Sequence, residues 1–307
     1  MHLKFNSTTQ VLLVFLLATI FGALLFGVLA NLSALLFLDI NVFDSNFDIE
    51  LLSKSEQINL FRLTQPFNTL GIFLFSPLVV KYFFSGESPI KFSYFKISYS
   101  SILGASALIV MVKPLVGWLA SINSSIDFSA FGSIGENLVE TSKLLAEKIA
   151  LVTVSHSVEE FVLNLVVVAL IPAIAEEFFF RGFLQQFLRK FTNSYHISVW
   201  VTAVVFGIIH FNILGILPLI FLGAILGYIY HFSQNIWISI LAHFINNASL
   251  LWFVYKYSYD VKDIGSESVP LQSILFSLLM TLAMLFFMYT IWEHKTSVLA
   301  DDRTKES

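Results

Sequence analysis

The stretch Ile171-Pro-Ala-Ile-Ala-Glu-Glu-Phe-Phe-Phe-Arg-Gly182 places two adjacent carboxylates and an arginine inside an apolar run. The run covers residues 161–188, which is long enough for a membrane-spanning helix of about 20 residues. An ionised side chain at the centre of a bilayer costs on the order of 2.5–3.5 kcal/mol, so such side chains face a protein interior or a wet cavity. Glu176, Glu177 and Arg181 therefore predict polar partners within a helical membrane protein.

The composition of the whole chain agrees with this fold class. Of its 307 residues, 57% are hydrophobic and only 12% are charged, whereas about a quarter of a soluble domain is charged. The absence of cysteine excludes disulfides, thiolate catalysis and thiolate metal sites. The net charge of −4 gives no reason to expect a nucleic-acid partner. We expect an all-α, polytopic protein with a single integral membrane domain over residues 1–307 and the lipid bilayer as its surroundings.

Apolar runs between polar segments predict eight transmembrane helices. They cover residues 11–38, 59–83, 100–122, 161–188, 197–211, 215–232, 236–255 and 271–292. The first run is too long for the apolar part of a cleaved signal peptide, so we expect a retained span. The second run contains Arg62 and Pro66, and the fifth has the length of a buried or partial span.

The charges between the runs predict the orientation. With the N-terminus in the cytoplasm, the loops on that side carry basic residues, namely Lys81, Lys91, Lys96, Arg189 and Lys190. The opposite loops carry most of the acidic residues together with some lysines. By the positive-inside rule, we expect both termini in the cytoplasm.

Two polar segments interrupt or follow the spans. Residues 123–157 predict an amphipathic surface segment with a helix over 138–154. Ser157, followed three residues later by Glu160, predicts a capping box that opens the fourth span. The tail 293–307 is charged and is expected to be disordered.

Three of the predicted spans carry side chains that hydrolytic enzymes use. In the fourth, Glu177 and Arg181 are four residues apart, so they share a helical face and predict an ion pair. Glu176 is rotated by about 100° and is left for chemistry. The alternative is that all three residues form a structural charge cluster. Pro172 is expected to kink this helix and to free a carbonyl group.

The other two spans carry histidines. In the fifth, Phe206 lies one helical turn before His210, which by itself would be read as an interfacial residue. In the seventh, His243 and Asn247 share one face, with Asn246 as a less favoured substitute for Asn247. His196 and His231 lie near the ends of spans and are also interpreted as interfacial.

A glutamate, two histidines and an asparagine in one wet cavity can act in two ways. Glu176, His210 and His243 can bind zinc or another divalent metal ion that carries a water molecule. Without a metal, the carboxylate and one imidazole can activate water while the other imidazole and the amide stabilise the oxyanion. Both routes predict hydrolysis of an acyl bond, with a peptide as the expected substrate.

The three motifs, taken together, match a known family. Glu-Glu-x-x-x-Arg at 176–181, Phe-x-x-x-His at 206–210 and His-x-x-x-Asn at 243–247 closely resemble the motifs of the CAAX-processing endoprotease and bacteriocin-processing (CPBP, or Abi) family. The resemblance covers residues 161–255, which we take as the catalytic core. It implies an eight-helix intramembrane endopeptidase whose site opens to the cytoplasm.

The resemblance also implies roles for individual residues. Glu176 and His210 would activate the attacking water, and His243 and Asn247 would stabilise the oxyanion. Glu177 and Arg181 would hold the site together. Members of the family are described as metalloproteases, but a metal-free, glutamate-dependent mechanism also has structural support in the family, so the cofactor stays open.

The substrate is not fixed by the resemblance, because family members process prenylated proteins or peptides or act in bacteriocin immunity. We expect a membrane-associated protein or peptide as substrate and, from the 33 phenylalanines, a bacterial cytoplasmic membrane. The alternative of another class is a non-enzymatic protein. It would be a proton-coupled transporter that uses Glu176 and His210, or a scaffold for bacteriocin immunity. The sequence contains no inverted repeat of the kind many transporters have.

Overall fold

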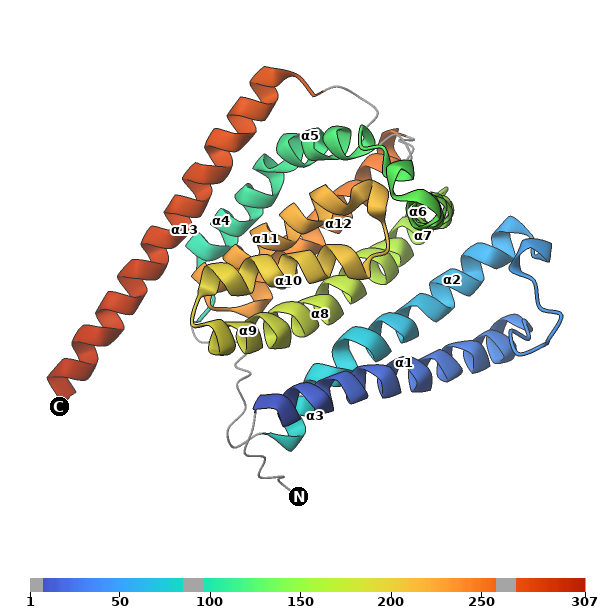
Figure 1. Ribbon diagram of the computed structural model, residues 1–307, viewed down its shortest axis with the longest axis horizontal. Coiled ribbons are helices and arrows are strands. Elements are labelled where there is room, and N and C mark those ends of the chain that lie inside the picture. The colour runs from blue at the N-terminus through green and yellow to red at the C-terminus, as the bar shows by residue number, and fades with distance from the viewer. Residues whose placement is uncertain (1–7, 85–95, 258–268, 307) are drawn as a thin grey trace. The chain divides into compact units, whose positions relative to one another are not determined.

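The computed structural model describes residues 8–84, 96–257 and 269–306, and the regular secondary structure of these residues is helical (Figure 1). Seven of their helical segments are long and apolar enough to cross a membrane: Thr9–Leu38, Lys54–Phe83, Tyr99–Ser124, Val158–Thr192, Ile213–Ser233, Ile236–Tyr257 and Leu271–His294. The predicted fifth span is the shorter helix α10 (Tyr195–Ile209). The all-α, polytopic fold is confirmed, and the chain is an integral membrane protein.

The chain divides into two compact units. The first consists of Met1–Lys91, Leu145–Phe187 and Asn247–Lys262, and the second of Phe92–Leu144, Leu188–Asn246 and Asp263–Ser307. Helices α6 (Gly132–Thr153), α9 (Gln185–Thr192) and α12 (Ile236–Tyr257) contribute to both. That the whole chain acts as one membrane domain stays a prediction.

The first unit contains α1 (Thr8–Leu38), α2 (Lys54–Thr69), α3 (Phe75–Phe83), α7 (Val158–Asn164) and α8 (Ile171–Glu177). Helices α1 and α2 lie side by side (Figure 1). Where α1 meets the π-helical turn Leu70–Leu74, which follows α2, a Cβ atom on Gly22 would collide with the backbone oxygen of Gly71. Small residues permit such contacts between membrane helices, where van der Waals packing drives association.

The helical segment that carries Glu176, Glu177 and Arg181 alternates between α-helical and π-helical geometry. A wide π-helical turn at Leu165–Leu170 precedes α8, and a second one at Phe178–Leu184 follows it. Between the two lies Pro172, which lacks a backbone N–H and crowds the carbonyl group four residues before it. The expected disturbance at Pro172 thus takes the form of a π turn, in which the N–H of Ile171 bonds to the carbonyl of Val166. Such turns are frequent at functional sites.

The second unit is built around α11 (Ile216–Ser233), which packs against α10, α5 (Lys113–Ser124) and α13 (Leu271–Glu306). Its core is aliphatic and joins α4 (Tyr99–Met111), α11 and α12 through residues such as Leu108, Ile109, Ile225, Ile229 and Ile238. This packing supports α10 and the first turns of α12, which carry the two predicted histidines.

The predicted span over residues 100–122 is two helices, α4 and α5, and the reason is a serine from a distant helix. Pro114 has no N–H to donate, and the next helical hydrogen bond is interrupted. The Oγ of Ser277 accepts from the Leu115 N–H at 3.3 Å and donates to the carbonyl oxygen of Met111 at 2.6 Å. A side chain that inserts into the helical ladder in this way bends the helix.

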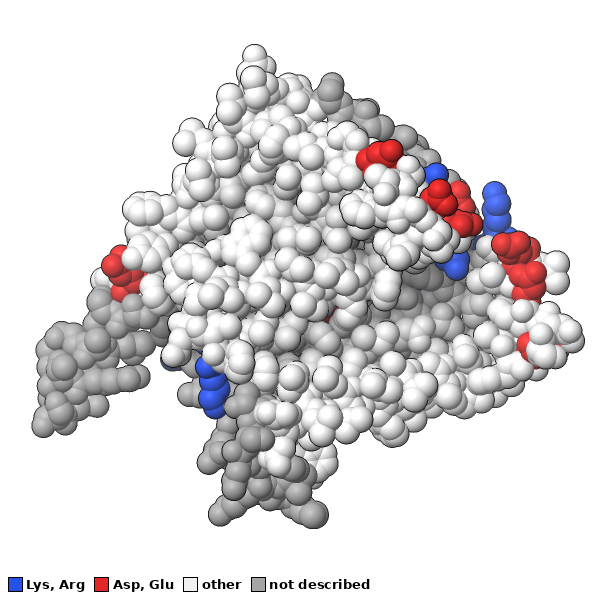
Figure 2. All heavy atoms as spheres, viewed as in Figure 1, with Lys and Arg blue, Asp and Glu red and all other residues white. Residues whose placement is uncertain are grey.

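The surface of the spanning helices is apolar. Helix α1 exposes leucines and phenylalanines along its length, such as Leu24, Leu36 and Phe37. In the face drawn in Figure 2, uncharged residues predominate and the charged ones lie near the margins. Helix α13 continues to Glu306, so residues 293–306 of the predicted disordered tail have a helical backbone. No glycine or proline follows Leu271 to stop a helix that has once formed.

The contact between Gly22 of α1 and Gly71 of the π-helical turn predicts the effect of a substitution. We expect Gly22→Ala to lower the free energy of unfolding by about 1–3 kcal/mol, because the added methyl group meets backbone that cannot move aside without separating the helices. The matched control is Gly27→Ala on the same helix, where the new Cβ would lie at an ordinary 4.0 Å from the Asn68 side chain. Thermal unfolding in detergent measures both. Equal midpoints for the two variants would contradict this account of the packing.

Candidate functional site

The central ion pair of the fourth span forms as predicted. The Nη1 of Arg181 donates to the Oε1 of Glu177 at 2.6 Å, and both side chains are fully buried. The guanidinium carbon also lies 5.9 Å from the centroid of the Phe180 ring, within the range of a cation–π contact.

Glu176 is buried beside this pair, with 8% of its surface exposed. Arg181 interacts electrostatically with both carboxylates, and more strongly with Glu177. The segment therefore holds two buried carboxylates for one guanidinium, so the Glu177 charge is compensated directly and the Glu176 charge less so.

An aromatic cluster in the first unit fixes the backbone around the motif. Phe15 of α1 stacks on Phe183 with a centroid distance of 3.7 Å and lies 4.8 Å from Phe179. Phe73 meets the Phe179 ring edge-on at 5.3 Å. Consecutive phenylalanines after Glu177 thus anchor the π turn that carries Arg181 to the neighbouring helices.

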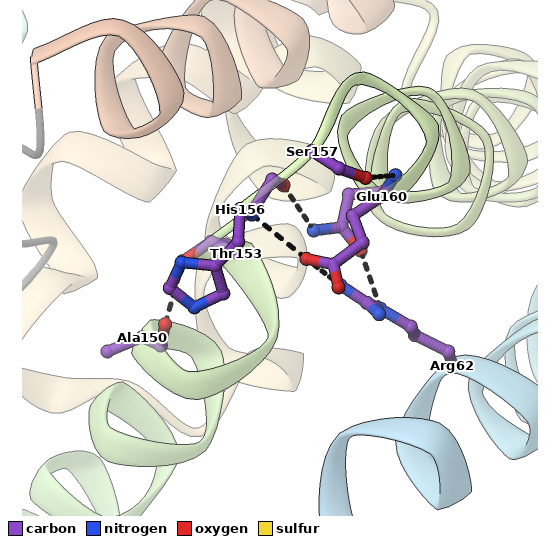
Figure 3. Close-up of polar contacts among 8 residues, drawn as sticks. Arg62, Ala150, Thr153, His156, Ser157 and Glu160 are labelled. Atoms are coloured by element: carbon purple, nitrogen blue, oxygen red, sulfur yellow. Dashed lines mark hydrogen bonds and ion pairs between the residues drawn. The ribbon is translucent and has the colours of Figure 1, made fainter. Parts of the chain in front are cut away.

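A polar network at the start of α7 involves Arg62, the arginine within the predicted second span (Figure 3). Its Nε donates to the Oδ1 of Asn164 at 3.0 Å, and its Nη2 lies 3.7 Å from the Oε2 of Glu160. Asn164 also donates to Ser155. One half of the predicted capping box forms, because the Glu160 N–H donates to the Ser157 hydroxyl. In the other half, the Glu160 carboxylate accepts from the N–H of His156 in place of the N–H of Ser157. These residues stabilise the N-terminus of α7.

In the second unit, one phenylalanine ring brings the two predicted histidines together. The Phe206 ring lies 4.5 Å from the His210 ring and 6.0 Å from the His243 ring, centroid to centroid. Phe206 and His243 are buried, and His210 is half-buried at the end of α10.

The hydrogen bond of His210 defines its tautomer. Its Nδ1 lies 2.6 Å from the carbonyl oxygen of Phe206. A carbonyl oxygen only accepts, so Nδ1 carries the proton and Nε2 of the neutral ring carries the lone pair. The Nε2 atom is therefore the one that can take a proton from water or bind a metal ion.

Two side chains that the sequence analysis missed hold the turn after His210. Asn123, which is fully buried, donates to the carbonyl oxygen of Ile213 at 2.9 Å and accepts from the N–H of Leu217 at 2.9 Å. The hydroxyl of Ser142 accepts from the Ile213 N–H at 2.8 Å. Phe211 has a φ of 50°, a left-handed conformation that is strained for a bulky residue and persists only where the surroundings impose it.

The remaining polar residues of the predicted spans are placed as follows. The Nζ of Lys113 donates to the Oδ1 of Asn246 at 2.7 Å, whereas Asn247 is half-buried. His231, interpreted as interfacial, is instead buried and stacks on Tyr195 at 4.1 Å, because apolar rings from neighbouring segments cover it. His196 is exposed and pairs with the hydroxyl of Tyr228.

The predicted site residues divide between the two units. Glu176, Glu177, Arg181 and Asn247 belong to the first, and Phe206, His210 and His243 to the second. Carboxylate and imidazole are the ligand types that zinc takes, so the predicted metal set of Glu176, His210 and His243 fits by donor type. Within either unit, the described residues contain no group of three histidines or acidic residues that could hold a metal ion.

The two hydrogen bonds of Asn123 predict that this side chain stabilises the turn after His210. We expect Asn123→Ala to lower the free energy of unfolding by about 1–3 kcal/mol, because two buried backbone groups lose their partner. Ser124→Ala is the control, since the Ser124 hydroxyl makes a bond to the nearby carbonyl of Ser121 at the exposed side of the helix. Thermal unfolding of both variants measures the difference, and an Asn123→Ala midpoint equal to the control would contradict it.

The comparison with protein families agrees with the motifs. Residues 158–249 match the profile of the family described as type II CAAX prenyl endopeptidase Rce1-like, and this segment contains all three motifs. Neither a curated protein nor a solved structure matches the chain at a significant level. The match over residues 158–249, together with the three motifs that it contains, supports assignment of this segment to the CPBP family of CAAX-processing membrane endopeptidases.

Proposed function

We propose that the protein is an intramembrane endopeptidase that hydrolyses peptide bonds of membrane-associated proteins or peptides, with Glu176, His210, His243 and Asn247 as its catalytic residues. The observation that carries the proposal is the contact of both histidine rings with Phe206, inside the segment that matches the endopeptidase family. The buried Glu176 on its own charged helix supplies the carboxylate that this chemistry requires.

In the proposed reaction, Glu176 and His210 activate water. The Nε2 of His210 or the carboxylate of Glu176 takes a proton from the water molecule, and the oxygen attacks the carbonyl carbon of the peptide bond. The proton then passes to the leaving nitrogen as the C–N bond breaks. The bond from His210 Nδ1 to the Phe206 carbonyl supports this role, since it keeps the lone pair on Nε2.

His243 and Asn247 stabilise the negative charge that develops on the carbonyl oxygen. An imidazole N–H and a side-chain amide can both donate a hydrogen bond to this oxyanion. The four-residue spacing on α12 supports a joint role, because it places both side chains on one helical face.

Glu177 and Arg181 serve the site as structural residues. The two charges of their buried ion pair compensate each other at short range, and Glu176 is the carboxylate proposed to act on water. Removal of either partner of the pair would leave the other charge buried without compensation, at a cost of several kcal/mol.

A divalent metal ion is the second form of the same proposal. Held by Glu176, His210 and His243, it would supply a Lewis acid that polarises the substrate carbonyl and makes a bound water more acidic. The same residues are required in both forms, and a chelator separates them.

Glu176→Gln tests the proposal directly, because it keeps the shape of the side chain and removes its charge. We expect cleavage of a membrane-anchored peptide library by the purified protein to fall about 100-fold or more. Glu140→Gln, at an exposed position of α6, is the matched control and should cleave like the wild type. Wild-type activity that survives a chelator supports the metal-free form, and its loss supports the metal. Full activity in Glu176→Gln would overturn the proposal.

Asn247→Ala separates an enzyme from a binding protein. We expect kcat to fall about 10²–10³-fold with little change in KM, because the lost hydrogen bond forms only in the transition state. Steady-state kinetics on the best library peptide measure this. A transporter or an immunity scaffold would instead keep its phenotype in cells that express the variant, and an unchanged kcat would remove Asn247 from the proposed mechanism.

A further inference from the structure

Lys113 is a charged residue within an apolar helical segment. It is the only charged residue between Tyr99 and Ser124, a segment long and apolar enough to cross a membrane. Among the residues that the structure describes, Lys113 forms no ion pair. Because an ammonium group in such a position is costly, its retention calls for a local function.

The fold delivers Lys113 to a defined place. Lys113 is the first residue of α5, immediately after the break that Pro114 and the inserted Ser277 hydroxyl create. The hydroxyl satisfies both backbone groups that the break would otherwise expose, namely the Leu115 N–H and the Met111 carbonyl. The lysine thus lies at the bend that the proline and the inserted serine produce.

The ammonium group contacts one residue of α12 twice. The Nζ of Lys113 lies 2.7 Å from the Oδ1 of Asn246 and 3.3 Å from the carbonyl oxygen of the same residue. Asn246 is three residues after His243 and directly precedes Asn247. Hydrogen bonds from a charged donor are shorter and stronger than neutral ones, so this contact holds both the side chain and the backbone of the turn.

We infer that Lys113 is a positioning residue that clamps α12 at Asn246 and so sets the orientation of His243 and Asn247. The inference rests on the proposed function for its catalytic meaning. The clamp also distinguishes the two adjacent asparagines: Asn246 accepts from Lys113, and Asn247 is the one that acts on the oxyanion. The positive charge beside this turn further favours the negative charge of the oxyanion.

The test compares Lys113→Met with Lys113→Arg and with Lys143→Met, an exposed lysine of α6. In Lys113→Met, we expect backbone amide exchange over residues 243–250 to become about 10-fold faster, as the turn opens more often. We also expect kcat to fall about 10- to 100-fold with little change in KM, since small displacements of catalytic groups have effects of this size. Lys113→Arg should retain most of the activity, and Lys143→Met should match the wild type.

Two further variants keep the inference falsifiable. Asn246→Leu removes the side-chain acceptor, which makes the shorter of the two contacts, and leaves Lys113 in place, so it should reproduce most of the loss. Asn246→Asp keeps a side-chain acceptor and should not reproduce it. In an Asn247→Ala background, Lys113→Met should cost less than it does in the wild type, because one of the two groups that it positions is already gone. Fully multiplicative losses in that background, or unchanged exchange and kcat in Lys113→Met, would overturn the inference.

The two proposals fail in different ways. If the wild type cleaves no peptide, the proposed function fails, while amide exchange still decides about the clamp. Faster exchange over residues 243–250 in Lys113→Met then supports the clamp, and unchanged exchange overturns it.

Discussion

The buried ion pair of Glu177 and Arg181 is the constraint on which the rest of the structure depends. Neither charge can face lipid, so the helix that carries them must lie inside protein, and the aromatic cluster of Phe15, Phe73 and Phe183 encloses it. Well-packed apolar residues often replace a buried ion pair without loss of stability. Its presence in a membrane span is therefore better explained by what it makes possible, which is a second carboxylate, Glu176, at the same depth.

Several polar groups elsewhere in the spans are likewise satisfied by residues distant in sequence. Arg62 binds Asn164, Asn123 holds both ends of the turn at Ile213, and the Ser277 hydroxyl enters the break before Leu115. An unsatisfied polar group costs several kcal/mol in an apolar medium, so each of these contacts fixes a helix position firmly. The two histidines therefore rest on a well-determined framework within their unit.

The sequence predicted those features that depend on residues close together in the chain. The four-residue spacing of Glu177 and Arg181 was sufficient to predict their ion pair, and the length of the apolar runs was sufficient for the helical membrane fold. Lys113 and Asn123 were missed because their partners lie 90 or more residues away in the chain. The break at Lys113 was also not predicted, since Pro114 signals a disturbance but the serine that completes it comes from α13. A lone lysine inside an apolar run was the one signal that pointed to Lys113.

The proposed function requires Glu176 and the two histidines to act on the same substrate molecule. The chain has no cysteine, so pairs of introduced cysteines can report proximity without a background. We would measure cross-linking of Glu176→Cys with His210→Cys by a short bifunctional reagent in membranes, against Glu176→Cys with His196→Cys near the opposite end of α10. We expect rapid cross-linking for the first pair and little for the second. Equal or absent cross-linking for both would contradict it.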